Sequence, residues 1–138
     1  MDLLSIYQWV YEKTDGRFTW LPGRLTVLLL RTIGRKSGEE RTAALVYLRD
    51  GDNLVVVASN GGSDRSPGWF FNLQKNPKVG VQIGRHRTRM RARIANPQER
   101  ARLWPLVNRN NSNRYDGYQA KTKRQIPIVI LSPRAAPG

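Results

Sequence analysis

The chain has 138 residues, a length that suits one domain. Its 24 Lys and Arg residues outnumber 10 Asp and Glu, which gives a formal net charge of +14. The surplus predicts an anionic partner: a nucleic acid, an acidic membrane face, or a phosphorylated or polycarboxylate ligand. There is no Cys and a single His, His86, which excludes disulfides, thiolate chemistry and metal sites built on paired imidazoles. No metal site is expected.

Residues 1–15 are predicted to form an amphipathic helix, because the apolar positions of 3–13 gather on one side at helical spacing. A helix lying on its own domain is one interpretation, and an interfacial helix in peripheral contact with a membrane is the other. The longest apolar run, Val27 to Leu30, is far short of the roughly 20 residues of a membrane span. No secretory signal pattern is present, so we expect a cytoplasmic protein.

About six strands are predicted from apolar runs and alternating patterns. They are 25–32, 41–49, 54–58, 79–83, 87–94 and 126–131. An Asp-Gly turn joins the second and third, so 41–58 is predicted to be a hairpin. Most neighbouring strands can pair in this way, which favours a mainly β fold with flanking helices: an antiparallel barrel or sheet.

Helices are predicted in the second half of the chain. One has Ser66 as its N-cap and Pro67 at its first helical position. Another begins at the capping pattern of 96–99 and runs to about Val107, where Pro105 should kink or end it.

A last short helix is predicted over 114–122, followed by a frayed tail at 132–138. There is no internal repeat and no composition shift typical of a linker. The sequence therefore predicts a single domain over 1–138.

A basic, glycine-containing loop follows the first strand. Its residues are Gly34, Arg35, Lys36, Ser37 and Gly38, with Arg41 close behind. The glycines let the backbone expose N–H groups, and the cationic and hydroxyl side chains add donors, as a phosphate or carboxylate ligand requires. A charged hairpin turn is the other interpretation.

A second loop of small residues follows the third strand: Ser59, Asn60, Gly61 and Gly62. Taken alone it is typical of an ordinary turn, but backbone there can also approach a flat ligand. Two such loops at the ends of adjacent strands favour a shared ligand groove. Trp69 and Asn72 could add a stacking face and an amide, or be a core Trp and an exposed Asn.

Two further patterns each allow a functional and a structural interpretation. Arg87, Arg89, Arg91 and Arg93 share one face of a strand, which suits nucleic-acid phosphates or a solvated sheet face. The strand has no aromatic residues for base stacking, and no binding motif is recognisable. Tyr115 and Tyr118 share a helix face, as a packing pair or as a source of a phenolic proton.

Several of these segments together resemble one family over about residues 23–131. They are Thr32-Ile33-Gly34-Arg35-Lys36-Ser37-Gly38, Arg41, Leu45 to Gly51, Ala58-Ser59-Asn60-Gly61-Gly62, Pro67-Gly68-Trp69, Asn72-Leu73, Asn76-Pro77, Tyr115-Asp116-Gly117-Tyr118-Gln119 and Ile126-Pro127-Ile128-Val129. In this order and spacing the chain resembles the deazaflavin-dependent nitroreductases. The resemblance implies a split β-barrel like that of FMN-binding reductases. It also implies hydride transfer from reduced coenzyme F420 (F420H2) to a small electron-poor acceptor: a quinone, an activated alkene or a nitro compound.

The resemblance also implies roles for single residues. Arg35, Lys36, Ser37 and Arg41, in the loop bounded by Gly34 and Gly38, would hold the coenzyme's tail, which carries a phosphodiester and several glutamates. Ser59, Gly61, Gly62, Trp69 and Asn72 would line the deazaflavin. Tyr118 would be the catalytic proton donor, with Tyr115 beside it. Asn60 stands at a tail contact where the family often has Lys, and Lys121 stands where it often has an aromatic residue, which implies a different substrate pocket.

Two other functions remain open at this point. A non-catalytic carrier of F420 or lipid would use the same groove, and a basic nucleic-acid-binding module would use the strand at 87–93. Either a monomer or a homodimer fits the sequence.

Overall fold

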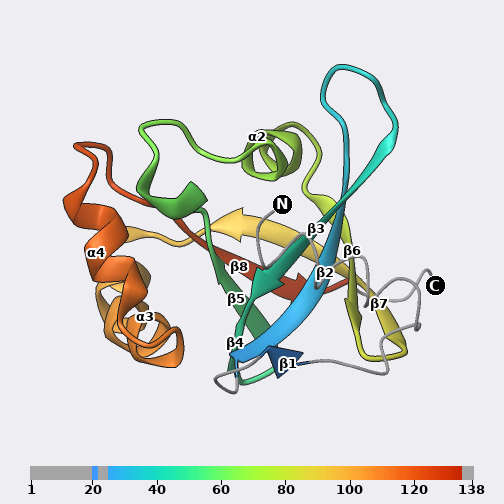
Figure 1. Cartoon of the computed structure of the whole chain (residues 1–138). Helices are drawn as coiled ribbons and strands as arrows, with labels where there is room; N and C mark the ends of the chain where they lie inside the picture. Colours follow the sequence, from blue (N-terminus) through green and yellow to red (C-terminus); the bar gives the residue numbers. More distant parts are fainter. Residues whose placement is uncertain (1–19, 22–24, 135–138) are drawn as a thin grey trace.

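The structure is a computed structural model that describes residues 20–21 and 25–134. The strands of this part are β1 (Trp20–Leu21), β2 (Leu25–Ile33), β3 (Glu40–Val46), β4 (Leu48–Asp50), β5 (Asn53–Val57), β6 (Lys78–Ile83), β7 (His86–Ile94) and β8 (Ile128–Pro133) (Figure 1). The helices are a short 3₁₀ helix η1 (Asn60–Gly62), α2 (Gly68–Lys75), α3 (Pro97–Asn110) and α4 (Arg114–Ala120). The helix predicted at 1–15 and most of the tail predicted at 132–138 lie outside the described residues.

The strands form one antiparallel sheet that closes on itself. Its order is β1-β2-β6-β7-β8-β5-β4, so β4 is the last strand at one end. The strand β3 pairs with β2, near the opposite end of this order. Since β3 and β4 follow each other directly in the chain, they act as one bent strand that connects β2 to β5. The result is a small barrel, as the antiparallel patterns predicted.

The bend between β3 and β4 lies at Tyr47. Val46 pairs with Val27 of β2, whereas Leu48 pairs with Val55 of β5. Tyr47 donates its N–H to the carbonyl of Thr26, and the Tyr47 carbonyl accepts from the Thr26 hydroxyl and the Asn110 amide at 3.1 and 2.9 Å.

The hairpin predicted over 41–58 is therefore wrong for most of its length. Only β4, at 48–50, pairs with β5, while 40–46 pairs with β2 across the basic loop. The Asp-Gly turn indicates local pairing correctly. It cannot reveal that the longer apolar strand at 25–33 provides a better partner for the preceding segment.

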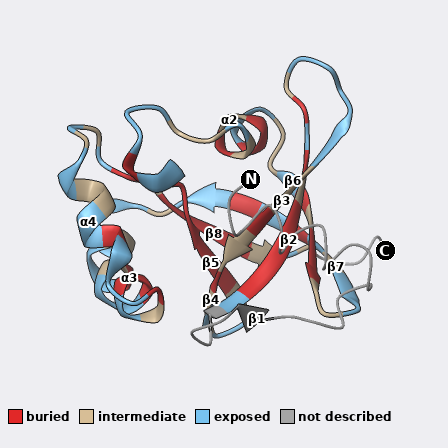
Figure 2. Cartoon of the chain, viewed as in Figure 1, coloured by how far each residue is buried: buried red, intermediate tan, exposed pale blue. Residues whose placement is uncertain are grey.

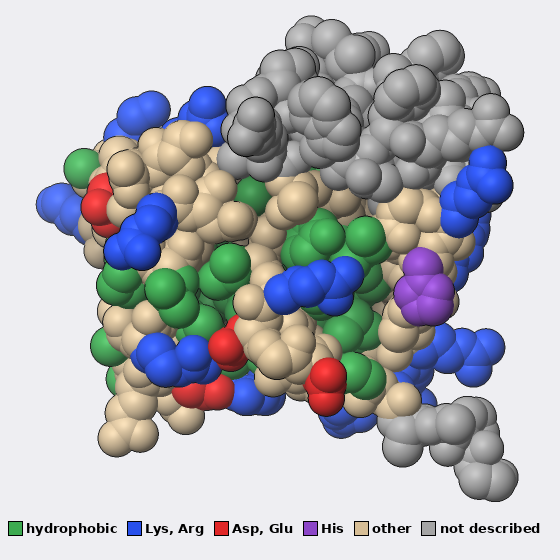
Figure 3. All heavy atoms as spheres, turned by 90° about the horizontal axis from the view of Figure 1, so that it is seen from below, with side chains coloured by type: hydrophobic (Ala, Val, Ile, Leu, Met, Phe, Trp, Pro, Cys, Tyr) green, Lys and Arg blue, Asp and Glu red, His purple; other side chains and the backbone are tan. Residues whose placement is uncertain are grey.

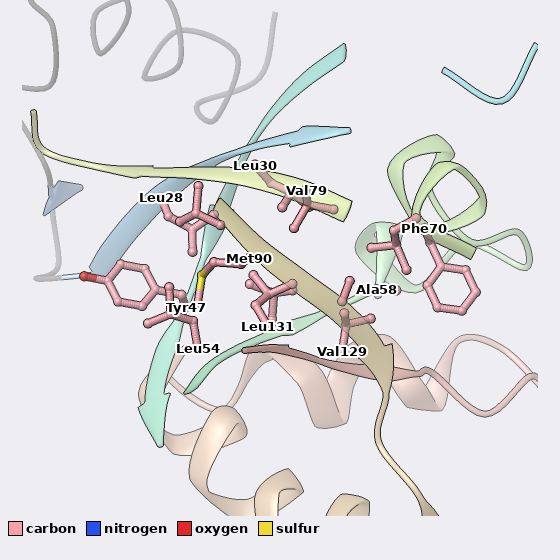
Figure 4. Packing of buried hydrophobic residues seen from close by; sticks show 14 residues of the cluster. Leu28, Leu30, Tyr47, Leu54, Ala58, Phe70, Val79, Met90, Val129 and Leu131 are labelled. Atoms are coloured by element: carbon pink, nitrogen blue, oxygen red, sulfur yellow. The ribbon is translucent and has the colours of Figure 1, made fainter. Parts of the chain in front are cut away.

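Alternation along the strands separates the buried side chains into clusters. The cluster inside the barrel includes Leu28, Leu30, Tyr47, Leu54, Val56, Ala58, Phe70, Leu73, Val79, Val81, Met90, Ala92, Val129 and Leu131 (Figure 4). Val27, Leu29 and Ala44 are buried on the opposite face of β2 and β3. The buried residues are concentrated in the strands, and α2 adds Phe70 and Leu73 to the barrel interior (Figure 2).

A third cluster joins the outer face of β5 and β8 to α3 and α4. Val55 and Val57 of β5 pack there with Leu103 and Val107 of α3. The helix α3 continues past Pro105 to Asn110, so this Pro does not end it. The helix α2 begins at Gly68 with Pro67 as N-cap, one residue later than predicted, so the prediction of Ser66 as its N-cap is wrong. No helix among the described residues is long and apolar enough to cross a membrane.

The capping pattern predicted for α3 is present. The Asn96 side chain accepts from the Glu99 N–H at 2.8 Å, and the Glu99 carboxylate accepts from the Asn96 N–H at 3.0 Å. That carboxylate also receives two hydrogen bonds of 2.7 Å from the Arg93 guanidinium. The Arg93 contact, followed by the Asn96 N–H, lowers the pKa of Glu99 from 4.5 to about 2.

A Glu99→Gln variant tests this arrangement through its pH dependence. Because the folded-state pKa is depressed, the ionised carboxylate stabilises the fold above its unfolded pKa, and this contribution is lost as pH falls toward about 2. The wild-type protein should thus have a higher Tm than the variant at neutral pH, and the difference should vanish near pH 2. Thermal unfolding across this range checks it, and a difference independent of pH would contradict it.

Candidate functional site

A groove of about 350 Å³ lies between the β2–β3 loop and the start of α2. Its lining residues are Thr32, Gly34, Arg35, Lys36, Ser37, Arg41, Thr42, Ala43, Gly68, Trp69 and Asn72. Two elements predicted separately from the sequence, the basic loop and the Trp69–Asn72 helix, therefore face each other. The groove follows from the fold, since α2 packs against β2 at the end where the loop begins.

The loop is tightly closed by its own backbone. The Gly34 N–H donates to the Glu39 carbonyl at 2.7 Å, and the Gly38 N–H donates to the Gly34 carbonyl at 2.9 Å. A Cβ at Gly34 would come within 2.6 Å of Ser37 Oγ, and Gly38 has a φ of +73°. The left-handed backbone of Gly38 favours glycine, and a side chain at Gly34 would displace the Ser37 hydroxyl.

This closure leaves donors at the tip of the loop. Within the part of the chain that the structure describes, the backbone N–H groups of Lys36 and Ser37 have no hydrogen-bond partner. Both residues line the groove. Adjacent unpaired N–H groups beside cationic side chains are a favourable setting for an anion.

The buried Asn72 ties the loop to α2. Its Oδ1 accepts from the backbone N–H and the guanidinium of Arg35 at 3.1 and 3.0 Å, and its Nδ2 donates to Thr32 Oγ1 at 3.1 Å. Lys75 adds a bond of 2.8 Å to the Arg35 carbonyl. The Asn72 amide thus holds the wall of the groove in place, and its side chain is already engaged.

The basic residues of the loop differ in how firmly they are held. The Arg35 guanidinium stacks on the Phe71 ring at 5.2 Å and bonds to Asn72, so it is part of the scaffold. Lys36 and Arg41 are exposed. Arg41 contacts Glu39 at 3.7 Å with both side chains more than half exposed, which makes a weak ion pair. Lys36 and Arg41 are therefore the cations available to a ligand.

The small-residue loop is placed differently from the basic one. Ser59, Asn60, Gly61 and Gly62 line no part of the groove, and η1 packs against α4. The contact is close, because a Cβ at Gly62 would be 2.7 Å from the Tyr118 carbonyl oxygen. Gly62 therefore packs on the backbone of Tyr118, which places the loop of 59–62 next to α4.

The two tyrosines of α4 are in edge contact, with ring centroids 6.2 Å apart. Tyr115 is buried among α3 and strand side chains, and this burial raises its pKa well above the ordinary value of 10. Tyr118 is half-buried. Tyr115 thus packs in the cluster that joins α3 and α4 to the sheet, neither tyrosine lines the groove, and the catalytic role predicted for Tyr115 stays a prediction. Tyr118 remains the candidate donor.

The family model described as F420H(2)-dependent quinone reductase matches residues 4–133 of this chain. An F420H(2)-dependent quinone reductase of Mycobacterium tuberculosis is 44% identical over 137 residues, which cover 97% of this chain and 92% of that protein. This chain belongs to the F420H(2)-dependent quinone reductase family. A protein of Mycobacterium bovis that is also named as an F420H(2)-dependent quinone reductase has the same identity and coverage.

Solved structures agree with this assignment. An F420-H2 dependent reductase (FDR-A) superimposes with a TM-score of 0.70 at 36% identity, covering 77% of this chain and 93% of that one. A structure described as a domain-swapped dimer has a TM-score of 0.73 at 32% identity, covering 92% and 99%. The predicted split-barrel fold, the oxidoreductase class and the dependence on reduced F420 are thereby confirmed.

Sequence reasoning missed Arg124. Its guanidinium donates to the main-chain carbonyls of Ser59 and Ser63, each at 2.8 Å. These acceptors are more than 60 residues away in the chain. Since any residue type supplies a carbonyl, no sequence pattern marks such a contact.

The arginine row of β7 lies outside the groove. Arg87, Arg89 and Arg91 are exposed, and Arg93 is engaged by Glu99. Arg89 pairs across the sheet with Gly80, and Arg91 with Lys78. In Figure 3, Lys and Arg side chains lie on both sides of the single His, where β7 begins. The face is exposed, and its interpretation as a solvated surface, without a role in nucleic-acid binding, stays a prediction.

Replacing Arg89 and Arg91 together by Gln tests whether this face belongs to the reductase site. Retention on DNA-cellulose at low salt should fall, because two phosphate-neutralising charges are lost. F420-dependent turnover should stay close to that of the wild-type protein, because neither residue lines the groove. Loss of turnover in a folded variant would place the row in the active site.

Proposed function

We propose that this protein transfers a hydride from reduced F420 to a quinone, with the coenzyme's anionic tail in the groove between the β2–β3 loop and α2. The unpaired N–H groups of Lys36 and Ser37, beside the exposed cations of Lys36 and Arg41, carry this proposal. A phosphodiester and glutamate carboxylates are acceptors that such donors suit. The residues present therefore fit the coenzyme's tail.

The proposal assigns the deazaflavin ring to the surface between the groove and α4. Trp69 is half-buried and offers an aromatic face at the groove. The backbone of 59–62 lies beside Tyr118 and leads within a few residues to α2. Backbone with small side chains lets a flat ring approach closely.

When bound, reduced F420 supplies the hydride. The protein holds the tail with the loop, positions the ring and provides a proton. Hydride transfer leaves an anion that takes up a proton: a stabilised oxyanion from a quinone, which water can also protonate, or a more basic anion from an activated alkene. The Tyr118 hydroxyl is the donor we assign, with its larger effect on the alkene. An activated alkene or nitro compound would use the same groups. Lys121, whose ammonium lies 5.8 Å from the Tyr118 ring centroid, adds a positive charge at this position.

Anaerobic turnover with reduced F420 and a soluble naphthoquinone tests the proposal. The F420 absorbance should return as the quinone is consumed, and reduced FMN or NADPH should support little or no reaction. Binding of F420 without turnover would instead favour the carrier function. Equal turnover with reduced FMN would contradict the assigned coenzyme specificity.

The solved relative described as a domain-swapped dimer supports a further proposal, that this protein is a homodimer. Light scattering coupled to size exclusion should give twice the mass of the 138-residue chain. Cytoplasmic localisation and membrane contact through residues 3–13 stay predictions.

A further inference from the structure

We infer that Arg124 is a positioning residue for the deazaflavin ring. It fixes the Ser59–Gly62 surface against α4, so that the coenzyme's ring and Tyr118 keep one relative position. The inference rests on the proposed function, because it is that proposal which assigns the ring to this surface. Arg124 itself is given no contact with the coenzyme.

The guanidinium of Arg124 binds the loop at both of its ends. On the strand side it donates to the Ser59 carbonyl at 2.8 Å and to the Ala58 carbonyl at 3.3 Å. On the helix side it donates to the Ser63 carbonyl at 2.8 Å and to Ser66 Oγ at 3.2 Å. One planar cation therefore clamps the beginning and the end of the segment that contains η1.

The segment that carries Arg124 is in turn held by α4. Gln119 donates its amide to the Arg124 carbonyl at 2.7 Å. Thr122 adds a second link to the loop, a hydrogen bond of 2.8 Å from its hydroxyl to the Asp64 carboxylate. The loop is thus connected to the helix of Tyr118 by two side chains of 121–125.

The loop needs this support because of its backbone conformation. Asn60, Gly61 and Gly62 are consecutive residues with φ of 46°, 64° and 86°. A non-glycine residue in the left-handed region costs free energy and persists where surrounding contacts determine the conformation. The loop's own bonds run from the Gly62 N–H to the Ser59 carbonyl at 2.9 Å and from the Asn60 amide to the Arg65 carbonyl at 3.0 Å. Arg124 adds the contacts that join both ends of the loop to the segment after α4.

Arg124→Lys tests the inference, with Arg102→Lys as the matched control. A Lys ammonium keeps the charge but cannot reach acceptors spread along both ends of the loop as a planar guanidinium does. Arg102 lies on α3, where its guanidinium bonds to the Asp50 carboxylate at 3.2 and 2.7 Å, and it bonds neither to 58–66 nor to α4. Both variants keep the net charge and the chain length.

Two readouts are measured on the full chain. Fluorescence titration gives the Kd for F420 and for the deazaflavin ring compound without the tail. Hydrogen exchange of the coenzyme-free protein reports the protection of 58–66. Arg124→Lys should weaken binding of both compounds about tenfold and by the same factor, and should speed exchange in 58–66. Arg102→Lys should leave both Kd values unchanged.

An unchanged Kd for the tail-less compound, with a lower Tm alone, would make Arg124 a purely structural residue and overturn the inference. Lys36→Ala separates this result from failure of the proposed function, since it should weaken F420 but not the tail-less compound. If Lys36→Ala has no effect on F420, the groove assignment fails whatever Arg124 does. If Arg124→Lys does not fold, the same two Kd values are measured for Thr122→Val. Both compounds should bind this variant more weakly than the wild-type protein, by a smaller factor than expected for Arg124→Lys. Unchanged Kd values would overturn the inference.

Discussion

Replacing both Lys36 and Arg41 by Ala should weaken F420 binding about hundredfold, with each single variant losing about tenfold. These are the exposed cations of the groove, while Arg35 is already engaged by Asn72 and Phe71. The loss should appear in the Kd from fluorescence titration. Added salt should weaken wild-type binding and affect the double variant less, because fewer charged contacts remain to be screened.

The matched control for this pair is Arg109→Ala. Arg109 is an exposed cation in the last turn of α3 and lines no part of the groove. Its removal should leave the Kd for F420 unchanged, which separates a local contact from a general effect of net charge. An unchanged Kd for F420 in the double variant would show that the coenzyme's tail does not bind in this groove.

Tyr118→Phe should lower kcat about a hundredfold for an activated-alkene acceptor and only slightly for a quinone. The variant keeps the ring that packs on Tyr115 and loses the hydroxyl. Hydride addition to an alkene leaves a basic anion, for which a positioned proton donor is worth about 10²–10⁴-fold. A quinone gives a more stable anion that water can protonate, so its rate depends less on the donor.

Steady-state kinetics with one acceptor of each kind checks this prediction. The Kd for F420 should change little, because the hydroxyl is not part of the tail site. Tyr115→Phe provides the comparison, since its buried hydroxyl should affect Tm more than kcat. If Tyr118→Phe reacts with both acceptors at the wild-type rate, Tyr118 only lines the pocket and is not the proton donor.

The strands could be predicted from the sequence because alternation and apolar runs are local properties. Predicted ranges such as 79–83 and 87–94 differ from β6 and β7 by one residue at their starts. The bend at Tyr47 could not be predicted in this way. It depends on Thr26 and Asn110, which lie far away in the chain and offer ordinary backbone and amide hydrogen bonds.

The sequence predicted which residues lie at the candidate site better than it predicted what each of them contacts. The loop of Lys36 lines a groove as predicted from its residues, but its partner there is the helix of Trp69 and not the second small-residue loop at 59–62. Asn72, however, bonds to the loop and to Thr32, which a sequence pattern cannot distinguish from a ligand contact. Spacing placed Tyr115 and Tyr118 on one helix face but could not tell which of them that face buries.

The most direct test of the coenzyme's position is an amide NMR titration of the wild-type protein with F420. The largest shifts are expected at the backbone N–H groups of Lys36 and Ser37, followed by 68–72 and 59–62. The tail-less ring compound should perturb 59–62 and Trp69 while leaving the Lys36 and Ser37 signals near their free positions. Shifts centred on β7, with Lys36 and Ser37 unmoved by F420, would contradict the account.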